Sequence, residues 1–236
     1  MSDTVMDAVV LCGGKGTRLK SVVPDLPKPM AALNDKPFIQ VLMEYAAAFG
    51  VKRFILAAGY MGDVIEKYFS DKSLGFEVVV CRETDPLDTA GALKNASGLI
   101  RTDQFLVMNG DSICRIDLRA FMDFHFSRKG LASVAVAKVA DAGSSGSVTK
   151  DAGDKILSFR EKAVAGPGYV NAGIYILDKT TLDTVPPGVR YSMERDLLPA
   201  LINGGEVYGY ATESRLFDIG TPEGYRRLRE EGEKLK

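Results

Sequence analysis

The sequence predicts an α/β protein in three layers, with helices on both faces of a mixed, mainly parallel sheet. In the first half of the chain, apolar runs of strand length alternate with helical patterns, as in parallel strands joined by crossover helices. In the second half, strand-like runs follow one another across short turns, which predicts an antiparallel extension of the same sheet. The 236 residues contain no Pro/Ser-rich linker or charge block, so we expect one domain, 1–236, with a well-buried core.

The first half predicts four strands and three helices in βαβαβαβ order. The expected strands are residues 8–11, 53–58, 76–81 and 105–108, and the expected helices lie near 38–49, 62–69 and 90–97. Ligands of such sheets bind beyond the carboxyl ends of the strands. Three stretches fall there: the glycine-rich loop after the first strand, residues 83–91 after the third, and Asn109-Gly110-Asp111 after the fourth.

The second half predicts closely spaced strands between helices. After a helix at 118–128, the expected strands are residues 132–139, 147–150, 155–159, 169–177 and 206–211, followed by a run at 216–220. A helix at 192–202 takes Ser192 as its N-cap, and Pro199 predicts a kink or an early end. The last, charged helix begins at Pro222 with Thr221 as its N-cap.

The loop after the first strand is suited to holding phosphates. Gly13, Gly14 and Gly16 can take positive φ and carry no Cβ, so successive backbone N–H groups can converge on an anion. Arg18 offers a planar fork for phosphate oxygens, and Lys15 offers a mobile point charge. The pattern matches neither the dinucleotide-binding fingerprint nor the P-loop. Taken alone, such a turn is about as often a plain tight connection as a phosphate cradle.

Charge and cysteine content exclude several classes of protein. Thirty basic and 31 acidic residues give a net charge of -1, whereas a general nucleic-acid or membrane-surface binder needs a basic excess. Cys12, Cys81 and Cys114 are odd in number and widely spaced, so we expect reduced core thiols in a cytoplasmic protein. The acidic stretch 1–7 has no apolar signal segment, and no run approaches the ~18 apolar residues of a membrane span.

Other candidate residues favour structural roles. His125 is the single histidine, which excludes a His-based metal cluster and argues against a Ser-His-Asp triad, so we expect a packed or half-exposed side chain. The aromatic cluster at 121–126 fits the core or a subunit contact, and the basic run at 226–229 fits a solvated helix face.

Five motifs stand in a fixed order along the chain. They are Gly13-Gly14-Lys15-Gly16-Thr17-Arg18-Leu19 with Pro27-Lys28-Pro29, Asn109-Gly110-Asp111, Glu161-Lys162, Asn171-Ala172-Gly173-Ile174-Tyr175, and Phe217-Asp218-Ile219-Gly220-Thr221-Pro222. Together they resemble the signature of the nucleotide-sugar pyrophosphorylases, or sugar-1-phosphate nucleotidyltransferases, over essentially the whole chain. Within that family, residues 11–14 and 20–31 are most similar to D-glycero-D-manno-heptose 1-phosphate guanylyltransferases.

The resemblance implies a Rossmann-like nucleotide-diphospho-sugar transferase fold, with a nucleotide-binding half at about 1–128 and a sugar-phosphate-binding half at about 129–236. The implied reaction is attack of a sugar 1-phosphate oxygen on the α-phosphorus of a nucleoside triphosphate, which gives a nucleotide sugar and pyrophosphate. No covalent nucleophile is needed, because a phosphate monoester is already nucleophilic. Two anions must be brought in line and their charge neutralised.

Four residues are the expected catalytic groups. By resemblance, Arg18 and the loop amides hold the β- and γ-phosphates, and Lys28, between two prolines, reaches the α-phosphate. Asp111 and Asp218 each end a strand-like segment, and two carboxylates at these positions suit Mg²⁺, which prefers oxygen ligands. Considered alone, Asp111 is equally compatible with a turn cap in Asn-Gly-Asp-Ser.

The resemblance also implies two groups of binding residues. The nucleotide side comprises Leu11, Gly13, Gly14, Gly16, Thr17, Arg18, Lys28, Glu83, Pro86, Thr89, Asn109 and Asp111. On the acceptor side, Glu161 accepts sugar hydroxyls, Lys162 binds the phosphate of the sugar, and Gly146 and Asn171 add sugar contacts; an exposed Glu-Lys ion pair is the plain alternative.

Residues 83–92 carry the expected choice of base. Glu83 stands where the family reads the base edge, and a carboxylate only accepts, so it favours the two donors of guanine. The family usually shows Leu-Gly-Thr-Gly-Gly-Ala where residues 87–92 read Leu-Asp-Thr-Ala-Gly-Ala, so Asp88 and Ala90 depart from the pattern.

The implied function is transfer of a guanylyl group from GTP to D-glycero-α-D-manno-heptose 1-phosphate, for synthesis of a surface polysaccharide such as a capsule or lipopolysaccharide. Mannose-1-phosphate guanylyltransferase and glucose-1-phosphate thymidylyltransferase are the alternatives among enzymes. The non-enzyme alternative is a nucleotide-sugar-sensing regulatory subunit of the same fold, and the chain allows a homodimer. The presence of Arg18, Lys28, Asp111 and Asp218 favours an enzyme.

Overall fold

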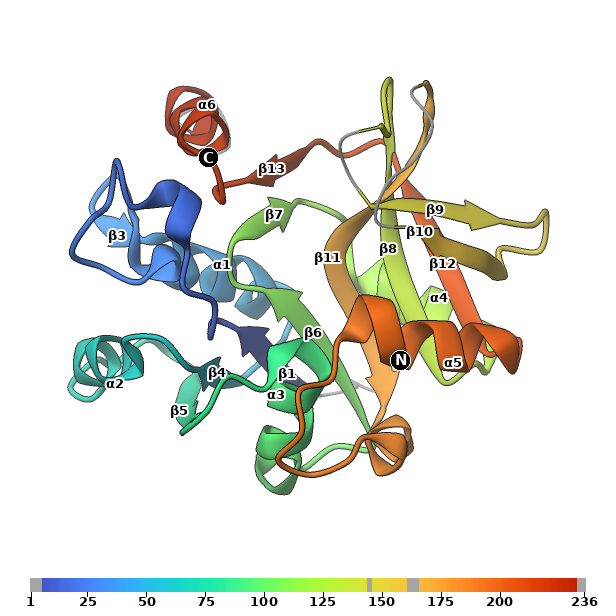
Figure 1. The fold of residues 1–236 in the computed structure, drawn as a ribbon, viewed down its shortest axis with the longest axis horizontal. Helices are drawn as coiled ribbons and strands as arrows, with labels where there is room; N and C mark the ends of the chain where they lie inside the picture. The colour runs from blue at the N-terminus through green and yellow to red at the C-terminus, as the bar shows by residue number, and fades with distance from the viewer. Residues whose placement is uncertain (1–5, 144–145, 161–165, 233–236) are drawn as a thin grey trace.

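The computed structural model describes residues 6–143, 146–160 and 166–232. A nine-stranded mixed sheet runs through its centre (Figure 1). Four of its strands come from the first half of the chain and lie parallel in the order β6-β1-β4-β5. They are β1 (Asp7–Leu11), β4 (Arg53–Ala58), β5 (Glu77–Arg82) and β6 (Gln104–Asn109). This arrangement confirms the predicted parallel half.

The second half extends the sheet from β6. Its strands are β8 (Ala132–Val139), β9 (Ser147–Lys150), β10 (Ile156–Arg160), β11 (Gly168–Asp178) and β12 (Val207–Thr212). Strand β11 is antiparallel to both β6 and β8, and the β9–β10 pair is antiparallel as well. The antiparallel extension expected for the runs from 132 to 177 is therefore confirmed. The strand expected at 206–211 had no predicted direction, and β12 runs parallel to β8.

Helices cover both faces of the sheet, as predicted. One face carries α1 (Phe38–Ala47), α2 (Gly62–Phe69), α4 (Leu118–Arg128) and α6 (Pro222–Gly232), and the other carries α3 (Asp88–Ala96) and α5 (Leu198–Asn203). In Figure 1, α3 and α5 lie in front of the sheet and α4 behind it. Ala8 and Val10 of β1 enter one hydrophobic core and Val9 enters the other, because successive side chains of a strand point to opposite faces.

The helix predicted at 192–202 is divided in two. A π-helical turn, η5 (Met193–Leu197), precedes α5, and Pro199 lies in the first turn of α5. Proline has no N–H to donate to the carbonyl four residues earlier, so the α-helical ladder is interrupted at this point. Ser192 is the N-cap as predicted, since its Oγ accepts from the N–H of Arg195 at 3.2 Å.

β13 (Leu216–Asp218) ends at Asp218, as expected for the run at 216–220. Several other short elements have no counterpart in the sequence prediction. They are β2 (Ala32–Leu33), β3 (Lys36–Pro37), β7 (Ser112–Cys114) and the 3₁₀ turns η1 (Thr17–Leu19), η2 (Lys28–Met30), η3 (Ser97–Leu99) and η4 (Lys179–Thr184). Strands and turns of two or three residues are too short to show a hydrophobic period. The antiparallel pairing of β7 with β13 matters most, because it joins segments about 100 positions apart.

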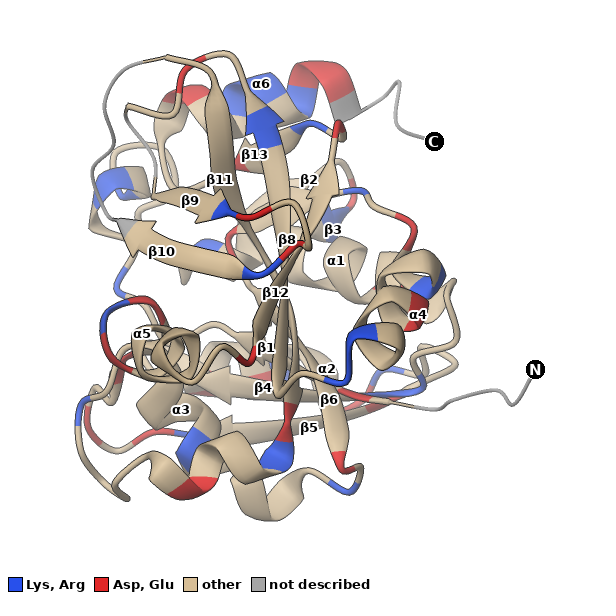
Figure 2. Cartoon of the chain, turned by 90° about the vertical axis from the view of Figure 1, so that its right-hand side faces the viewer, with Lys and Arg blue, Asp and Glu red and all other residues tan. Residues whose placement is uncertain are grey.

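Charged residues of both signs are distributed over both halves of the chain (Figure 2). Within the part of the chain that the structure describes, no helix has the length and apolar character needed to cross a membrane. Cys12, Cys81 and Cys114 are free thiols, and Cys12 and Cys114 are buried.

His125 is buried in α4 and carries an unpaired ring nitrogen. Its side chain is 1% exposed, and Nδ1 lies 2.9 Å from Oγ of Ser133 on β8. Nε2 is buried without a hydrogen-bond partner. Because burial disfavours the charged imidazolium, it lowers the pKa of His125 to about 4.

We expect His125 to make the protein acid-sensitive. Between pH ~6.5 and 4 the unfolded chain binds this proton and the folded chain does not, so stability falls as the pH is lowered through that window. This one group should reduce the free energy of unfolding by about 2 kcal/mol at pH 5 relative to neutral pH. Urea unfolding of the wild type and of His125→Asn at pH 7.5 and 5 measures the effect, because other groups cancel in the comparison. An equal acid-induced loss in both proteins would contradict it.

Candidate active site

A cavity of about 640 Å³ opens at the carboxyl ends of the parallel strands. Stretches that follow β1, β5 and β6 supply most of its wall. The expected nucleotide-side residues that line it are Leu11, Gly13, Gly14, Gly16, Lys28, Glu83, Pro86, Thr89, Asn109 and Asp111. Thr17 and Arg18 lie in the adjacent turn η1, where both are exposed and neither lines the cavity.

Two glycines of the loop, Gly13 and Gly16, leave no room for a side chain. A Cβ on Gly13 would stand 2.8 Å from Oε1 of Glu83, so the carboxylate packs directly on the loop backbone. Gly16 has a φ of +57°, and a Cβ there would stand 2.9 Å from Cβ of Lys28. Any side chain at these two positions would displace a residue that lines the cavity.

Lys28 binds a carboxylate in the described structure. Its Nζ donates to Oδ2 of Asp111 at 2.6 Å, and the lysine side chain is only 11% exposed. A Cβ on Gly220 would stand 2.7 Å from the same Nζ and 2.6 Å from Oδ1 of Asp218. The expected phosphate-binding cation and both expected metal ligands therefore meet at one point.

The pairing of β7 with β13 brings the two aspartates together. Asp218 stands opposite Ser112, and the N–H of Ile219 donates to the carbonyl of Asp111 at 2.9 Å. Among the described residues, no group of three or more His, Cys, Asp and Glu side chains could hold a metal. A pair of carboxylates fits Mg²⁺ bound to nucleotide phosphates, because Mg²⁺ commonly takes one or two carboxylates and completes its shell with phosphate oxygens and water.

Glu83 lines the cavity directly after β5, with its carboxyl group against the backbone of Gly13. Its N–H continues the ladder to the carbonyl of Ala58 at 2.9 Å, and its Oε2 accepts from the N–H of Leu87 at 3.2 Å. Burial raises the pKa of Glu83 above its ordinary value, against the opposing effect of that hydrogen bond. The hydrogen bond from Leu87 orients the side chain, and in its ionised form the carboxylate only accepts hydrogen bonds.

Asp88 stands where the family usually has glycine, and its backbone lies in the left-handed region that favours glycine. Its φ is +62°, and its carboxylate compensates by accepting from the N–H of Thr89 at 2.9 Å and pairing with Nη2 of Arg195 at 2.6 Å. Aspartate is one of the few residues that tolerate this region. Ala90 is buried within α3. Both departures from the family pattern therefore preserve the turn and the helix.

Segment 189–191, from the second half of the chain, caps α3. The carbonyl of Tyr191 accepts from the N–H groups of Ala90 and Gly91 at 2.8 and 2.9 Å. A Cβ on Gly91 would stand 2.6 Å from the carbonyl of Val189, so the two segments touch. This contact brings Arg190 to the cavity, where its Nε donates to the carbonyl of Pro86 at 3.1 Å.

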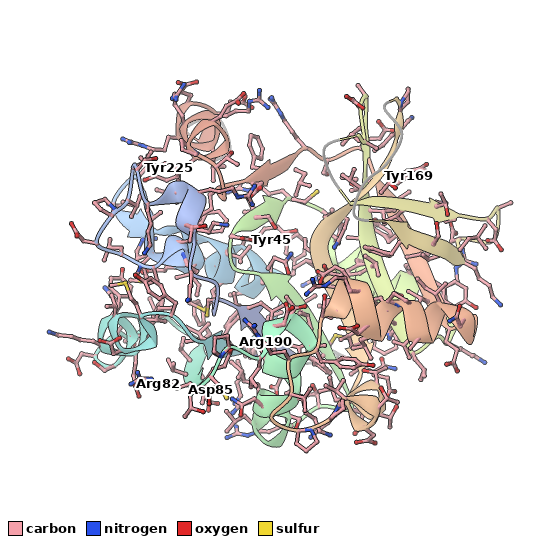
Figure 3. All side chains as sticks on the ribbon, viewed as in Figure 1. Tyr45, Arg82, Asp85, Tyr169, Arg190 and Tyr225 are labelled. Carbon is pink, nitrogen blue, oxygen red and sulfur yellow. The ribbon has the colours of Figure 1, made fainter. Side chains whose placement is uncertain are left out.

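Sequence reasoning did not identify Arg190 or Tyr60 as cavity residues. Figure 3 shows Arg190 beside the start of α3, near Asp85. Tyr60 enters the lining because its N–H donates to the carbonyl of Gly13 at 3.1 Å. Neither residue belongs to a recognisable motif, and each reaches the cavity through a contact distant in sequence, so no local signal marks them.

Two of the four expected acceptor-side residues, Gly146 and Asn171, lie in the described part of the chain. The N–H of Asn171 donates to the carbonyl of Gly146 at 3.2 Å, so these two expected sugar contacts are adjacent. Neither lines the 640 Å³ cavity, and neither does Asp218. Glu161 and Lys162 lie outside the described residues.

The chain matches known proteins over nearly its whole length. The nucleotidyl transferase family matches residues 7–234. A mannose-1-phosphate guanylyltransferase of Mycobacterium tuberculosis is 37% identical over 96% of this chain, which spans 64% of that protein's length. A D-glycero-alpha-D-manno-heptose 1-phosphate guanylyltransferase of Aneurinibacillus thermoaerophilus is 33% identical, with 96% of this chain and 98% of that protein covered.

A solved structure also resembles the described fold. HddC from Yersinia pseudotuberculosis superimposes with a TM-score of 0.86 at 37% identity, covering 98% of this chain and 100% of that one. HddC was also solved in a complex with GMP-PN, and that structure has a TM-score of 0.83. The motifs, the fold and these relatives agree, and the chain belongs to the nucleotidyl transferase family.

Proposed function

We propose that the protein transfers a guanylyl group from GTP to a sugar 1-phosphate, with release of pyrophosphate, and that the acceptor is D-glycero-α-D-manno-heptose 1-phosphate. The observation that carries this proposal is one cavity that joins a glycine loop, the Lys28–Asp111 pair and the carboxyl group of Glu83. Relatives named as heptose 1-phosphate guanylyltransferases match along their whole length, which supports the choice of acceptor.

The roles of the residues follow from charge. The loop 13–16 and Arg18 would hold the β- and γ-phosphates, and Lys28 would leave Asp111 to meet the α-phosphate, where negative charge develops. Members of this family generally use a divalent metal. We propose Mg²⁺ held by Asp111 and Asp218, which would neutralise the phosphate oxygens and orient them. Glu161, Lys162, Asn171 and Gly146 remain the proposed acceptor contacts.

Mannose 1-phosphate is the second candidate acceptor, because the mycobacterial relative at 37% identity bears that name. The contacts that would separate a hexose from a heptose include Glu161 and Lys162, which lie outside the described residues. We place the reaction in the cytoplasm, with a surface polysaccharide as the destination of the product.

A pyrophosphate-release screen tests the function. The protein is incubated with Mg²⁺, each of the four common nucleoside triphosphates, and the 1-phosphates of D-glycero-α-D-manno-heptose, mannose and glucose. We expect the highest kcat/KM for GTP with the heptose 1-phosphate. Highest activity with mannose 1-phosphate would favour the second candidate, and release from no pair would favour a regulatory subunit that binds nucleotide sugars.

Glu83→Gln should weaken the preference for GTP. The amide adds a donor where guanine also presents donors, so the ratio of kcat/KM for GTP over UTP should fall by roughly 10- to 100-fold. Glu66→Gln, which removes an exposed carboxylate from α2, is the matched control and should leave the ratio unchanged. An unaltered ratio in Glu83→Gln would remove Glu83 from base recognition.

Arg18→Ala should impair use of the triphosphate more than binding of the acceptor. Loss of a charge-assisted contact should raise KM for GTP by about tenfold, with KM for the sugar 1-phosphate changed by less than about twofold. Lys20→Ala is the control, because Lys20 is an exposed cation next to the same turn and lies over the ring of Tyr60. Equal increases in both KM values would contradict the division of the site.

A further inference from the structure

Glu194 lies on the π-helical turn η5 and accepts hydrogen bonds from hydroxyl groups in both halves of the chain. Its Oε2 accepts from Oγ1 of Thr89 at 3.1 Å and from Oγ of Ser192 at 3.2 Å. Its Oε1 accepts from the hydroxyl of Tyr175 at 3.2 Å. Because an ionised carboxylate can only accept, the protons of these hydroxyls must all point toward Glu194.

Because Tyr175 donates its proton to Glu194, it acts as the acceptor in its hydrogen bond with Asn171. Its side chain is fully buried, and its hydroxyl accepts from Nδ2 of Asn171 at 2.6 Å. Burial raises the pKa of Tyr175 well above its ordinary value, so the hydroxyl keeps its proton for Glu194 and offers only lone pairs to the amide of Asn171.

The amide of Asn171 is held at both of its ends. Oδ1 accepts from the N–H of Gly173 at 3.0 Å while Nδ2 donates to Tyr175, so only one orientation of the amide satisfies both partners. Gly173 can approach because it has a φ of +73° and carries no Cβ. The remaining hydrogen of Nδ2 and the second lone pair of Oδ1 are then presented in fixed directions.

Thr89 connects the same carboxylate to the cavity. It lines the cavity at the first turn of α3, and its Oγ1 accepts from the N–H of Met193 at 2.7 Å while donating to Glu194. Glu194 therefore lies between a residue on the nucleotide side and a residue on the acceptor side.

We propose that Glu194 is a positioning residue that fixes the amide orientation of Asn171 through Tyr175, and with it the acceptor side of the site. This inference rests on the proposed function for the role of Asn171, but the orientation of the amide does not depend on any activity. Glu194 lies in the first part of the π-helical turn η5, and such turns are frequent at functional sites.

Glutamine at position 194 would have nearly the same size as glutamate, but it would no longer require every neighbouring hydroxyl to donate to it. Its oxygen is expected to stay with Thr89 and Ser192, because that choice keeps two hydrogen bonds, and its NH₂ then faces Tyr175. The tyrosine hydroxyl would accept from that NH₂ and turn its proton toward Asn171. The N–H of Gly173 would still require Oδ1 of Asn171, so Nδ2 would face a second donor and no orientation of the amide would satisfy both partners. The hydrogen bond from Thr89 would be kept.

Glu194→Gln should therefore affect the two substrates differently. KM for the sugar 1-phosphate should rise by about tenfold, while KM for GTP changes by less than about threefold. Glu213→Gln removes an exposed carboxylate that pairs with Lys138 and not with the residues of this network, and it should change neither value. An unchanged KM for the sugar phosphate in an active Glu194→Gln enzyme would overturn the proposal.

A double-mutant cycle tests the route through Tyr175. Tyr175→Phe alone should also raise KM for the sugar phosphate, and Glu194→Gln should then add less than about a twofold further increase. Equal effects of Glu194→Gln in both backgrounds would overturn the route. If Glu194→Gln does not fold, Tyr175→Phe remains decisive, because a wild-type KM for the sugar phosphate in that variant would also reject the proposal.

A spectroscopic readout separates this inference from the proposed function. The side-chain ¹H–¹⁵N signals of Asn171, assigned by their loss in Asn171→Asp, should shift or broaden in Glu194→Gln and stay in place in Glu213→Gln. Unmoved Asn171 signals in Glu194→Gln would overturn the positioning role. A wild type that releases no pyrophosphate with any acceptor would overturn the proposed function, while these signals would still decide the role of Glu194.

Discussion

The close approach of β6 to β1 at Gly110 determines how the candidate site is assembled. The two strands are parallel, with Leu11 opposite Asn109, and the N–H of Gly110 donates to the carbonyl of Leu11 at 2.8 Å. A Cβ on Gly110 would stand 2.6 Å from that oxygen, so a larger residue would push the strand ends apart. Because the approach is close, Asp111 emerges beside the glycine loop, within reach of Lys28.

The electrostatics of the site depend on contacts from both ends of the chain. Lys28 is nearly buried, and a buried cation needs a partner, which Asp111 supplies. Asp218 joins this pair only because β13 returns to pair with β7. Under the proposed function, a triphosphate would offer Lys28 a stronger negative charge than Asp111 does, and a divalent metal would offer both aspartates a stronger positive charge than Lys28 does.

The second half of the chain also determines the geometry of the nucleotide side. Segment 189–191 caps α3 through the carbonyl of Tyr191, and Glu194 receives the hydroxyl of Thr89. The start of α3, which forms one wall of the cavity, is therefore held by the half expected to bind the acceptor. Hydrogen bonds therefore connect the proposed nucleotide side to the proposed acceptor side. These bonds are the physical basis for assigning Glu194 a role in positioning.

By itself the sequence determined the regular elements and the family, because hydrophobic period, capping and motif spacing are local properties. The bounds of β4, α2, α4, β8 and β9 agree with the prediction residue for residue, and Ser192 and Thr221 cap their helices. Only the tertiary structure decided the parallel course of β12, the pairing of Lys28 with Asp111, and the arrival of Arg190 at the cavity. These features arise from strand register and from contacts between residues far apart in the chain, which leave no period or spacing to detect in the sequence.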